Sequence, residues 1–195
     1  MKKHKFRLLI ILGICLVMIS VSLLLAFRIR IHRGAEYSQR ILSAINEILP
    51  ERTVGVPGMY SVSGMPVLEM EGVDYAALVE VPSFGVALPV ANQWDSKNLS
   101  LTPARFAGSA YDSSLVIGGI DDSRQFGFCD KIQHGAIITV TDMTGAQFTY
   151  TVCQIDRAKH AETQWLTEAE YDLTLFCHDV YAMEYIAVRC VLSYG

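Results

Sequence analysis

The first hydrophobic pattern in the chain is a run of 20 residues without a charge, from Leu8 to Phe27. A helix rises about 1.5 Å per residue, so this run would span roughly 30 Å, the thickness of the hydrocarbon core of a bilayer. The run is longer than the apolar part of a signal peptide and lacks a small-residue cleavage pattern. We therefore expect residues 8–27 to be an uncleaved transmembrane anchor.

The orientation of this anchor follows from its flanks. Four basic residues precede the run and three follow it, so the positive-inside rule favours a cytoplasmic N-terminus only slightly. The short N-terminal tail and the large C-terminal part favour the same orientation. We expect a single-pass protein of the cell membrane, with residues 1–7 in the cytoplasm and an extracytoplasmic C-terminal domain.

After the anchor the pattern becomes helical and then irregular. Ile41, Ala44, Ile45 and Ile48 follow the i, i+3, i+4, i+7 spacing of an amphipathic helix over residues 35–49, which Pro50 ends. Residues 51–70 are rich in Gly and Pro and have little periodicity, which indicates an extended linker. Residues 28–70 are thus predicted to be a juxtamembrane helical stalk and linker.

From about residue 71 the pattern is that of β-strands. Short apolar or alternating runs are bounded by turn residues, and Asp142–Gly145 indicates a hairpin turn between two of them. In the last run, Ile186, Val188 and Cys190 share one face and Tyr185 and Arg189 the other. The runs are 76–81, 86–90, 115–119, 136–141, 147–155, 172–177 and 185–192. Seven short strands and one weak helical stretch near 163–171 predict a mainly β domain, a small barrel or sandwich over residues 71–195.

Charge and cysteine content narrow the function. Beyond residue 33 the chain has nine Lys and Arg against 20 Asp and Glu, a net charge of −11, which excludes nucleic acid as the expected partner. Cys129, Cys153, Cys177 and Cys190 lie in the predicted domain, where disulfides form readily, and three full pairings are open. No His/Cys spacing is typical of zinc, so we expect no metal and no cofactor.

Several strings in this domain occur in a familiar order. They are ALVEVPSFGVALPV, RFAGSAYDSSLVIGG, DMTGAQFTYTV, YDLTLFC and VRC. Together with an N-terminal anchor and a stalk they resemble the sortases, membrane-tethered cysteine transpeptidases that attach surface proteins to the cell wall or pilus of Gram-positive bacteria. The resemblance is to clostridial sortases related to class B and covers roughly residues 65–190. It implies a closed β-barrel of sortase type.

The sortase mechanism needs a Cys nucleophile, a His acid and an Arg that stabilises the oxyanion. The resemblance places the His position at Ile120. An alignment without gaps places His178 at the nucleophile position and Tyr185 at the Arg position. A one-residue gap would restore Cys177 as the nucleophile, but it would restore neither the His nor the Arg.

Neighbouring residues are poor replacements. Cys177, His178 and Asp179 are consecutive, and adjacent side chains of a strand point to opposite faces. Arg189 shares a face with Tyr185 but lies about 13 Å further along the strand, so we expect it to be a surface residue. His160 lies in the loop before residue 172, which borders the substrate groove in sortases, and a role for it in a rearranged site stays open.

Three hypotheses result. The first is a catalytically degenerate sortase, a pseudoenzyme that binds sorting-signal peptides or pilin-like surface proteins at the cell envelope. The second is a divergent active sortase that uses Cys177 with His160 or His178 as an unusual acid. The third is structural: Cys177 forms a disulfide with Cys129, Cys153 or Cys190.

Overall fold

The computed structural model describes residues 2–60, 64–160, 162–167, 170–179 and 182–193, with the backbone alone for residues 2–12 and 25–35. The chain divides into two compact units, residues 1–36 and residues 37–195. Helix α1 (Lys2–Ile48) runs through the first unit into the second. Among the described residues, no helix is both long and apolar enough to cross a membrane.

The predicted short helix at 35–49 is the C-terminal end of α1 rather than a separate element. No proline lies between residue 28 and residue 49, so nothing in that stretch removes a helical hydrogen bond. The helix ends before Pro50, as predicted, and the Leu49 amide still donates to the Ile45 carbonyl at 2.8 Å.

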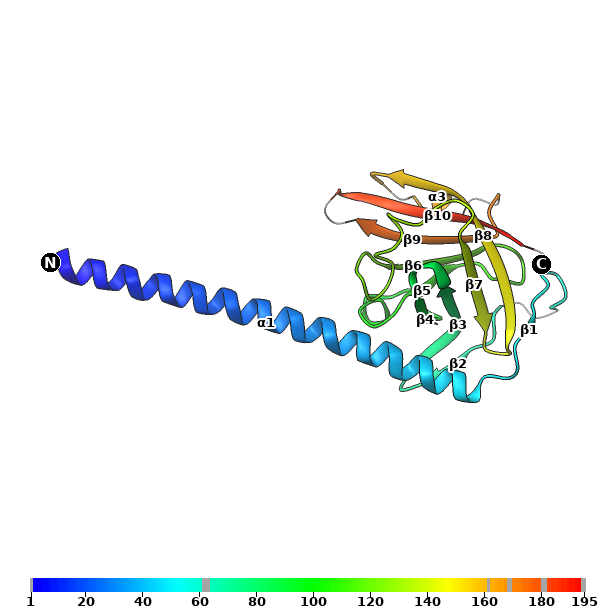
Figure 1. Cartoon of the computed structure of the whole chain (residues 1–195), viewed down its shortest axis with the longest axis horizontal. Helices are drawn as coiled ribbons and strands as arrows, with labels where there is room; N and C mark the ends of the chain where they lie inside the picture. The colour runs from blue at the N-terminus through cyan, green and yellow to red at the C-terminus, as the bar shows by residue number, and fades with distance from the viewer. Residues whose placement is uncertain (1, 61–63, 161, 168–169, 180–181, 194–195) are drawn as a thin grey trace. The chain divides into compact units, whose positions relative to one another are not determined.

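The second unit is built on a closed sheet (Figure 1). Within the described part of the chain, eight strands form a ring in the order β3–β4–β5–β6–β9–β10–β8–β7, and β7 returns to β3. The bounds are β3 Val73–Val81, β4 Val86–Ala91, β5 Ala104–Ala107, β6 Leu115–Ile120, β7 Ile137–Asp142, β8 Ala146–Ala158, β9 Leu173–Asp179 and β10 Glu184–Leu192. The predicted barrel is confirmed, and closure leaves little of its edge unpaired.

The predicted linker at 51–70 is not free of the sheet. β1 (Thr53–Val54) pairs in parallel with the start of β8, and β2 (Leu68–Met70) forms a hairpin with β3. These strands have two and three residues, too few to show a period of two. β5 was missed for the same reason. The short helices are η1 Pro82–Phe84, α2 Ser96–Leu99 and α3 Thr163–Leu166; α3 covers only the start of the predicted helical stretch, which also includes residues 168–169, outside the described residues.

Two layers pack on the sheet. Alternate side chains such as Ile117, Phe148 and Val188 fill the barrel interior, as the alternation in the sequence predicts. On the outside, Ile41 and Ile45 of α1 pack against Tyr75, Leu78 and Ala91 of β3 and β4. The apolar stripe predicted for this part of the helix therefore covers one outer face of the barrel and leaves the face of β6, β9 and β10 to other elements.

Candidate functional site

The three positions that the resemblance to sortases assigned to catalysis lie side by side. β6 runs parallel to β9 with Ile120 opposite His178, and β10 runs antiparallel to β9 with Tyr185 opposite His178. Directly opposed side chains share one face of a sheet, and the rings of His178 and Tyr185 lie 4.6 Å apart between centroids. We call Ile120, His178 and Tyr185 the central row.

Cys177 lies on the other face of β9. Its side chain is fully buried in the barrel interior, with Sγ 3.9 Å from the Phe126 carbonyl oxygen. The Cys129 amide donates to the same oxygen at 2.9 Å. Burial, and then a hydrogen bond with Cys177, raise the pKa of the Cys129 thiol. Cys177 and His178 therefore point to opposite faces, as the alternation predicts.

The cysteines of the barrel are free thiols in this structure. Cys153, on β8, is half-buried, whereas Cys129, Cys177 and Cys190 are buried in one core. Burial raises the pKa of the Cys190 thiol well above its usual range. The structure does not contain the disulfide of the third hypothesis.

The other candidate stand-in, His160, is exposed near the end of β8, in the connection of residues 159–172 between β8 and β9. Because Cys177 is enclosed in the barrel, the structure does not bring this imidazole and that thiol together.

Arg189 is not the surface residue that the sequence predicted, because its side chain is fully buried. Nε donates to Asp156 at 3.2 Å, and Nη1 donates to the Thr174 hydroxyl at 3.1 Å and the Leu166 carbonyl at 3.2 Å. Nη2 donates to the Trp165 carbonyl at 2.5 Å. The guanidinium thus holds the β8–β9 connection against the sheet.

Two aromatic rings enclose the same guanidinium. Its Cζ lies 4.9 Å from the ring centroid of Trp165 and 5.1 Å from that of Tyr171. The prediction missed this environment because both rings come from a connection whose path is set by tertiary contacts. Trp165 therefore has a packing role, with its ring against the Arg189 guanidinium.

A further apolar cluster lies on this outer face of the sheet, separate from the barrel interior and from the residues packed under α1. Val116, Phe176 and Ala187 of the strands are covered by Leu166 of the connection, with Tyr185 at the edge. A small cavity of about 170 Å³ adjoins it, lined in part by Val116, Thr174, Leu166 and Tyr171. The four cluster residues are themselves buried, so an extended ligand on this face would contact the small cavity and the partly exposed rings of Phe106 and Tyr185.

Trp94 also lies on this face, and sequence reasoning did not single it out. It belongs to the segment between β4 and α2, and the centroid of its ring lies 5.3 Å from the ring centroids of both Phe106 and Phe176. Gly118 of β6 lies directly beneath it. Gly118 was the one signal in the sequence for this contact, because a glycine within a strand often marks a place where another group approaches the backbone closely.

Carboxylates flank the central row. Asp121 follows Ile120, and Asp179 follows His178. Burial, and then the charges of Asp179 and Asp130, raise the pKa of the Asp121 carboxyl. No group of three or more His, Cys, Asp or Glu side chains among the described residues is arranged to hold a metal ion.

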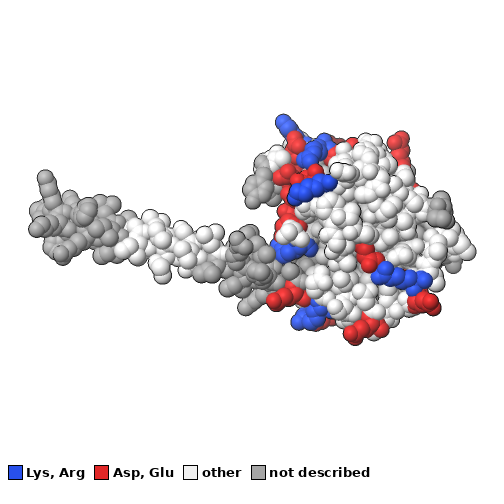
Figure 2. Space-filling view, in the orientation of Figure 1, with Lys and Arg blue, Asp and Glu red and all other residues white. Residues whose placement is uncertain are grey.

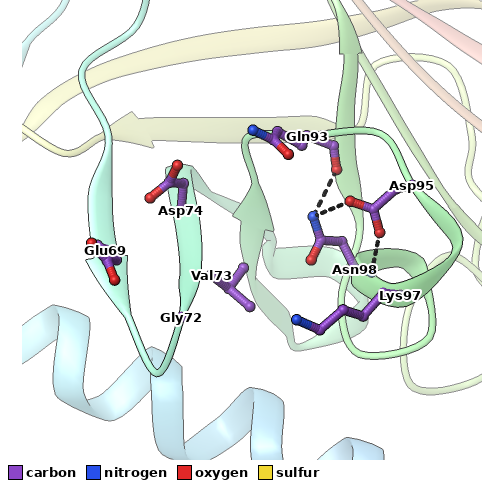
Figure 3. Close-up of a pocket in the computed structure, with 8 residues that line it drawn as sticks. All are labelled: Glu69, Gly72, Val73, Asp74, Gln93, Asp95, Lys97 and Asn98. Atoms are coloured by element: carbon purple, nitrogen blue, oxygen red, sulfur yellow. Dashed lines mark hydrogen bonds between the residues drawn. The ribbon is translucent and has the colours of Figure 1, made fainter.

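Another cavity, of about 360 Å³, lies elsewhere, between the β2–β3 hairpin and α2 (Figure 3). Asp95 caps α2 through the Asn98 amide at 2.8 Å and also accepts from the Asn98 side chain. Asp95 and Asn98 thus satisfy polar groups of each other, and no residue of the central row lines this cavity.

Charge is mixed over the surface. On the face drawn in Figure 2, acidic and basic side chains lie beside one another, with uncharged surface between these groups. Arg52 pairs with Glu80 and Arg40 with Glu71, so some of the expected acidic surface is locally neutralised.

Comparison with known proteins identifies the fold. No family model and no curated protein matches the chain, but solved structures do. A Clostridium perfringens sortase D5 transpeptidase is 21% identical, with a TM-score of 0.54 over 62% of this chain and 80% of its own. Sortase C1 of Streptococcus agalactiae is 22% identical, with a TM-score of 0.57 over 66% of this chain and 72% of its own. Streptococcus pneumoniae sortase C is 18% identical, with a TM-score of 0.56 over 84% of this chain and 90% of its own. The barrel of this chain therefore has the sortase fold.

Proposed function

We propose that this chain is a membrane-anchored, sortase-like surface protein without transpeptidase activity, which acts as a binding or assembly module at the cell envelope. The observation that carries the proposal is the central row. Isoleucine at 120 has no proton to give, and at 185 a phenol stands where sortase chemistry needs a permanent cation. The thiol of Cys177 is on the opposite face and has no exposed surface.

The size of the catalytic loss supports this choice. Removing members of a cooperating nucleophile and base set costs roughly 10⁴–10⁶ in rate, and an oxyanion donor adds about 10²–10³. A fully buried thiol would in addition have to reach a substrate carbonyl through the sheet that separates it from the outer face. A binding role needs none of these groups.

The partner that we propose is an extended peptide, from a sorting signal or a pilin-like surface protein. The structural study of Streptococcus pneumoniae sortase C concerns pilin substrate specificity. The outer face of this barrel has a small cavity beside its apolar cluster, with the partly exposed rings of Phe106 and Tyr185 at the border of that cluster. The location at the membrane rests on the uncharged run of residues 8–27 in the sequence.

The test is a turnover assay on the full chain. The chain is incubated with a sorting-signal peptide and an amine nucleophile, and products are followed by mass spectrometry. We expect no cleavage or transfer above that of Cys177→Ala, and weak peptide binding that is equal in both proteins. Turnover that disappears in Cys177→Ala would overturn the proposal.

The alternative is a divergent active sortase that uses Cys177, with His178 or His160 as the acid. It requires the strand end at residues 177–179 to turn so that the thiol reaches the outer face. Fast labelling of native Cys177 by iodoacetamide near neutral pH would favour it. The buried position of this thiol favours slow labelling instead.

A further inference from the structure

The side chain of Trp94 lies on the sheet beside the central row. Its ring meets Phe106 edge-on, at an interplanar angle of 89°, and Phe176 at 39°, with both centroids 5.3 Å away. Aromatic pairs at such distances attract each other beyond the burial of their area. We call the surface formed by Phe106, Gly118 and Phe176 the Trp94 site.

Gly118 is a glycine because of this ring. Its backbone is not in the left-handed region, so its conformation does not call for glycine. A Cβ at this position would overlap the Trp94 ring and lie 2.6 Å from Cζ of Phe176. The missing side chain therefore creates the space that an aromatic ring fills.

The Trp94 site adjoins the central row. Gly118 precedes Ile120 by two residues on β6, and Phe176 precedes His178 by two on β9. Residues two apart share a face and are separated by about 6.6 Å along the strand. A peptide that follows β6 and β9 toward the central row would meet the ring of Trp94.

The two segments that cover this face are held differently. Arg189 fixes the β8–β9 connection through several hydrogen bonds from a fully buried guanidinium. Trp94 is 39% exposed, and within the described part of the chain no hydrogen bond holds its indole. The Trp94 ring is thus the part of this face that a competing ring can replace at the lower cost.

We propose that the Trp94 site binds an aromatic side chain of an extended peptide, and that Trp94 occupies it as an internal ligand until the peptide displaces it. The proposal rests on the proposed function for the peptide, and it adds the chemistry of the recognised residue. In the presence of Trp94 the apparent affinity is the intrinsic affinity of the empty site multiplied by the fraction of molecules in which the site is open.

The test uses the full chain and N-acetyl-tryptophanamide, a blocked tryptophan, as the probe. We expect the Trp94→Ala variant to bind this probe about tenfold or more tightly than the wild type, measured by saturation-transfer NMR. N-acetyl-leucinamide should show no such gain. Trp165→Ala is the matched control, because it removes the chain's other tryptophan and leaves the Trp94 site occupied.

Equal binding by wild type and Trp94→Ala would overturn the proposal, as would a gain that survives in the Trp94→Ala, Gly118→Val double variant. A second measurement applies even where Trp94→Ala fails to fold. In a Trp165→Phe background Trp94 is the only tryptophan, and its emission is observed by selective excitation of tryptophan. There Gly118→Ala should expel the ring, red-shift its emission and increase quenching by acrylamide. An unchanged spectrum would contradict the proposal. These results do not depend on sorting-signal peptides, so their failure is separable from that of the proposed function.

Discussion

Arg189 shows how a single residue decides what the outer face can do. A cation there would ordinarily remain in water, because taking a charge out of solvent is costly unless it is paired and hydrogen-bonded. Here Asp156 supplies the opposite charge, and the carbonyls of Trp165 and Leu166 and the hydroxyl of Thr174 accept hydrogen bonds from the guanidinium. The residue therefore serves to close a connection over the sheet rather than to contact a substrate oxygen.

We predict that Arg189→Met lowers the free energy of unfolding by about 3 kcal/mol. The change leaves Asp156 and two carbonyl oxygens without their donor in a largely buried place. Urea unfolding followed by circular dichroism measures the loss. Arg157→Met is the control, because this neighbouring arginine of β8 is exposed and its replacement should cost about 0.5 kcal/mol or less. Similar losses for both variants would contradict the role given to Arg189.

The raised pKa of Asp121 should make the free energy of unfolding depend on pH. Burial, and then Asp179 and Asp130, raise the pKa of this carboxyl in the folded chain, so the folded state binds its proton more tightly than the unfolded state. Folding is therefore penalised at pH values above the raised pKa. The penalty fades as the pH falls through the folded pKa, and it is absent below the lower pKa of the unfolded state.

We accordingly predict that Asp121→Asn stabilises the chain at pH 7 by about 0.5 kcal/mol or less, and that the gain shrinks toward about pH 4 and is lost below it. Urea unfolding at the two pH values tests this. Glu47→Gln, at an exposed carboxylate of α1, is the control and should show no such trend. A gain for Asp121→Asn that grew toward low pH would show the assigned sign to be wrong.

At the scale of elements, the β7–β8 turn joins two parts of the fold. Gly145 has a φ of +87°, and a Cβ on it would lie 2.9 Å from the Glu51 carbonyl oxygen and 3.0 Å from that of Pro50. The Thr53 amide donates to the Gly145 carbonyl at 2.9 Å. The chain that follows α1 thus packs against this turn, and its hydrogen bond to Gly145 begins the pairing of β1 with β8.

We predict that Gly145→Ala costs about 1 kcal/mol more than Gly135→Ala. Both glycines have a positive φ, of +87° and +83°, but a Cβ at Gly135 meets nothing within 4 Å. The pair shares the cost of a left-handed alanine, roughly 1–2 kcal/mol, and differs by the clash with residues 50 and 51. Thermal unfolding of the two variants measures the difference. Equal costs would mean that the approach of these residues relaxes freely.

The elements that the sequence predicted are those long enough to show a period. β8, with Phe148, Tyr150 and Val152 facing inward, is 13 residues long, and the hairpin turn before it carries a clear signal. β1, β2 and β5 have two to four residues and owe their place to their neighbours. The same holds for the site: alternation alone placed Cys177 and His178 on opposite faces, but the burial of Arg189 and the position of Trp94 depend on connections without periodicity.

At the scale of the whole molecule, the barrel encloses one interior core. Cys129 lies in the segment after β6, Cys177 on β9 and Cys190 on β10, yet all three belong to the same buried cluster. Side chains in such a core become accessible chiefly when the whole barrel opens, because cooperative units unfold together.

We therefore predict that Cys129, Cys177 and Cys190 react with iodoacetamide at one common rate, at least about 10³-fold below that of an unfolded thiol. Half-exposed Cys153 should react earlier and acts as the internal control. Mass spectrometry of labelled peptides at increasing urea follows each residue, and the three core rates should rise together. If Cys177 instead reacts ahead of Cys190, the end of β9 opens on its own. Such an opening would let the Cys177 thiol reach the outer face. Only then would a divergent active transpeptidase explain this barrel better than a binding module.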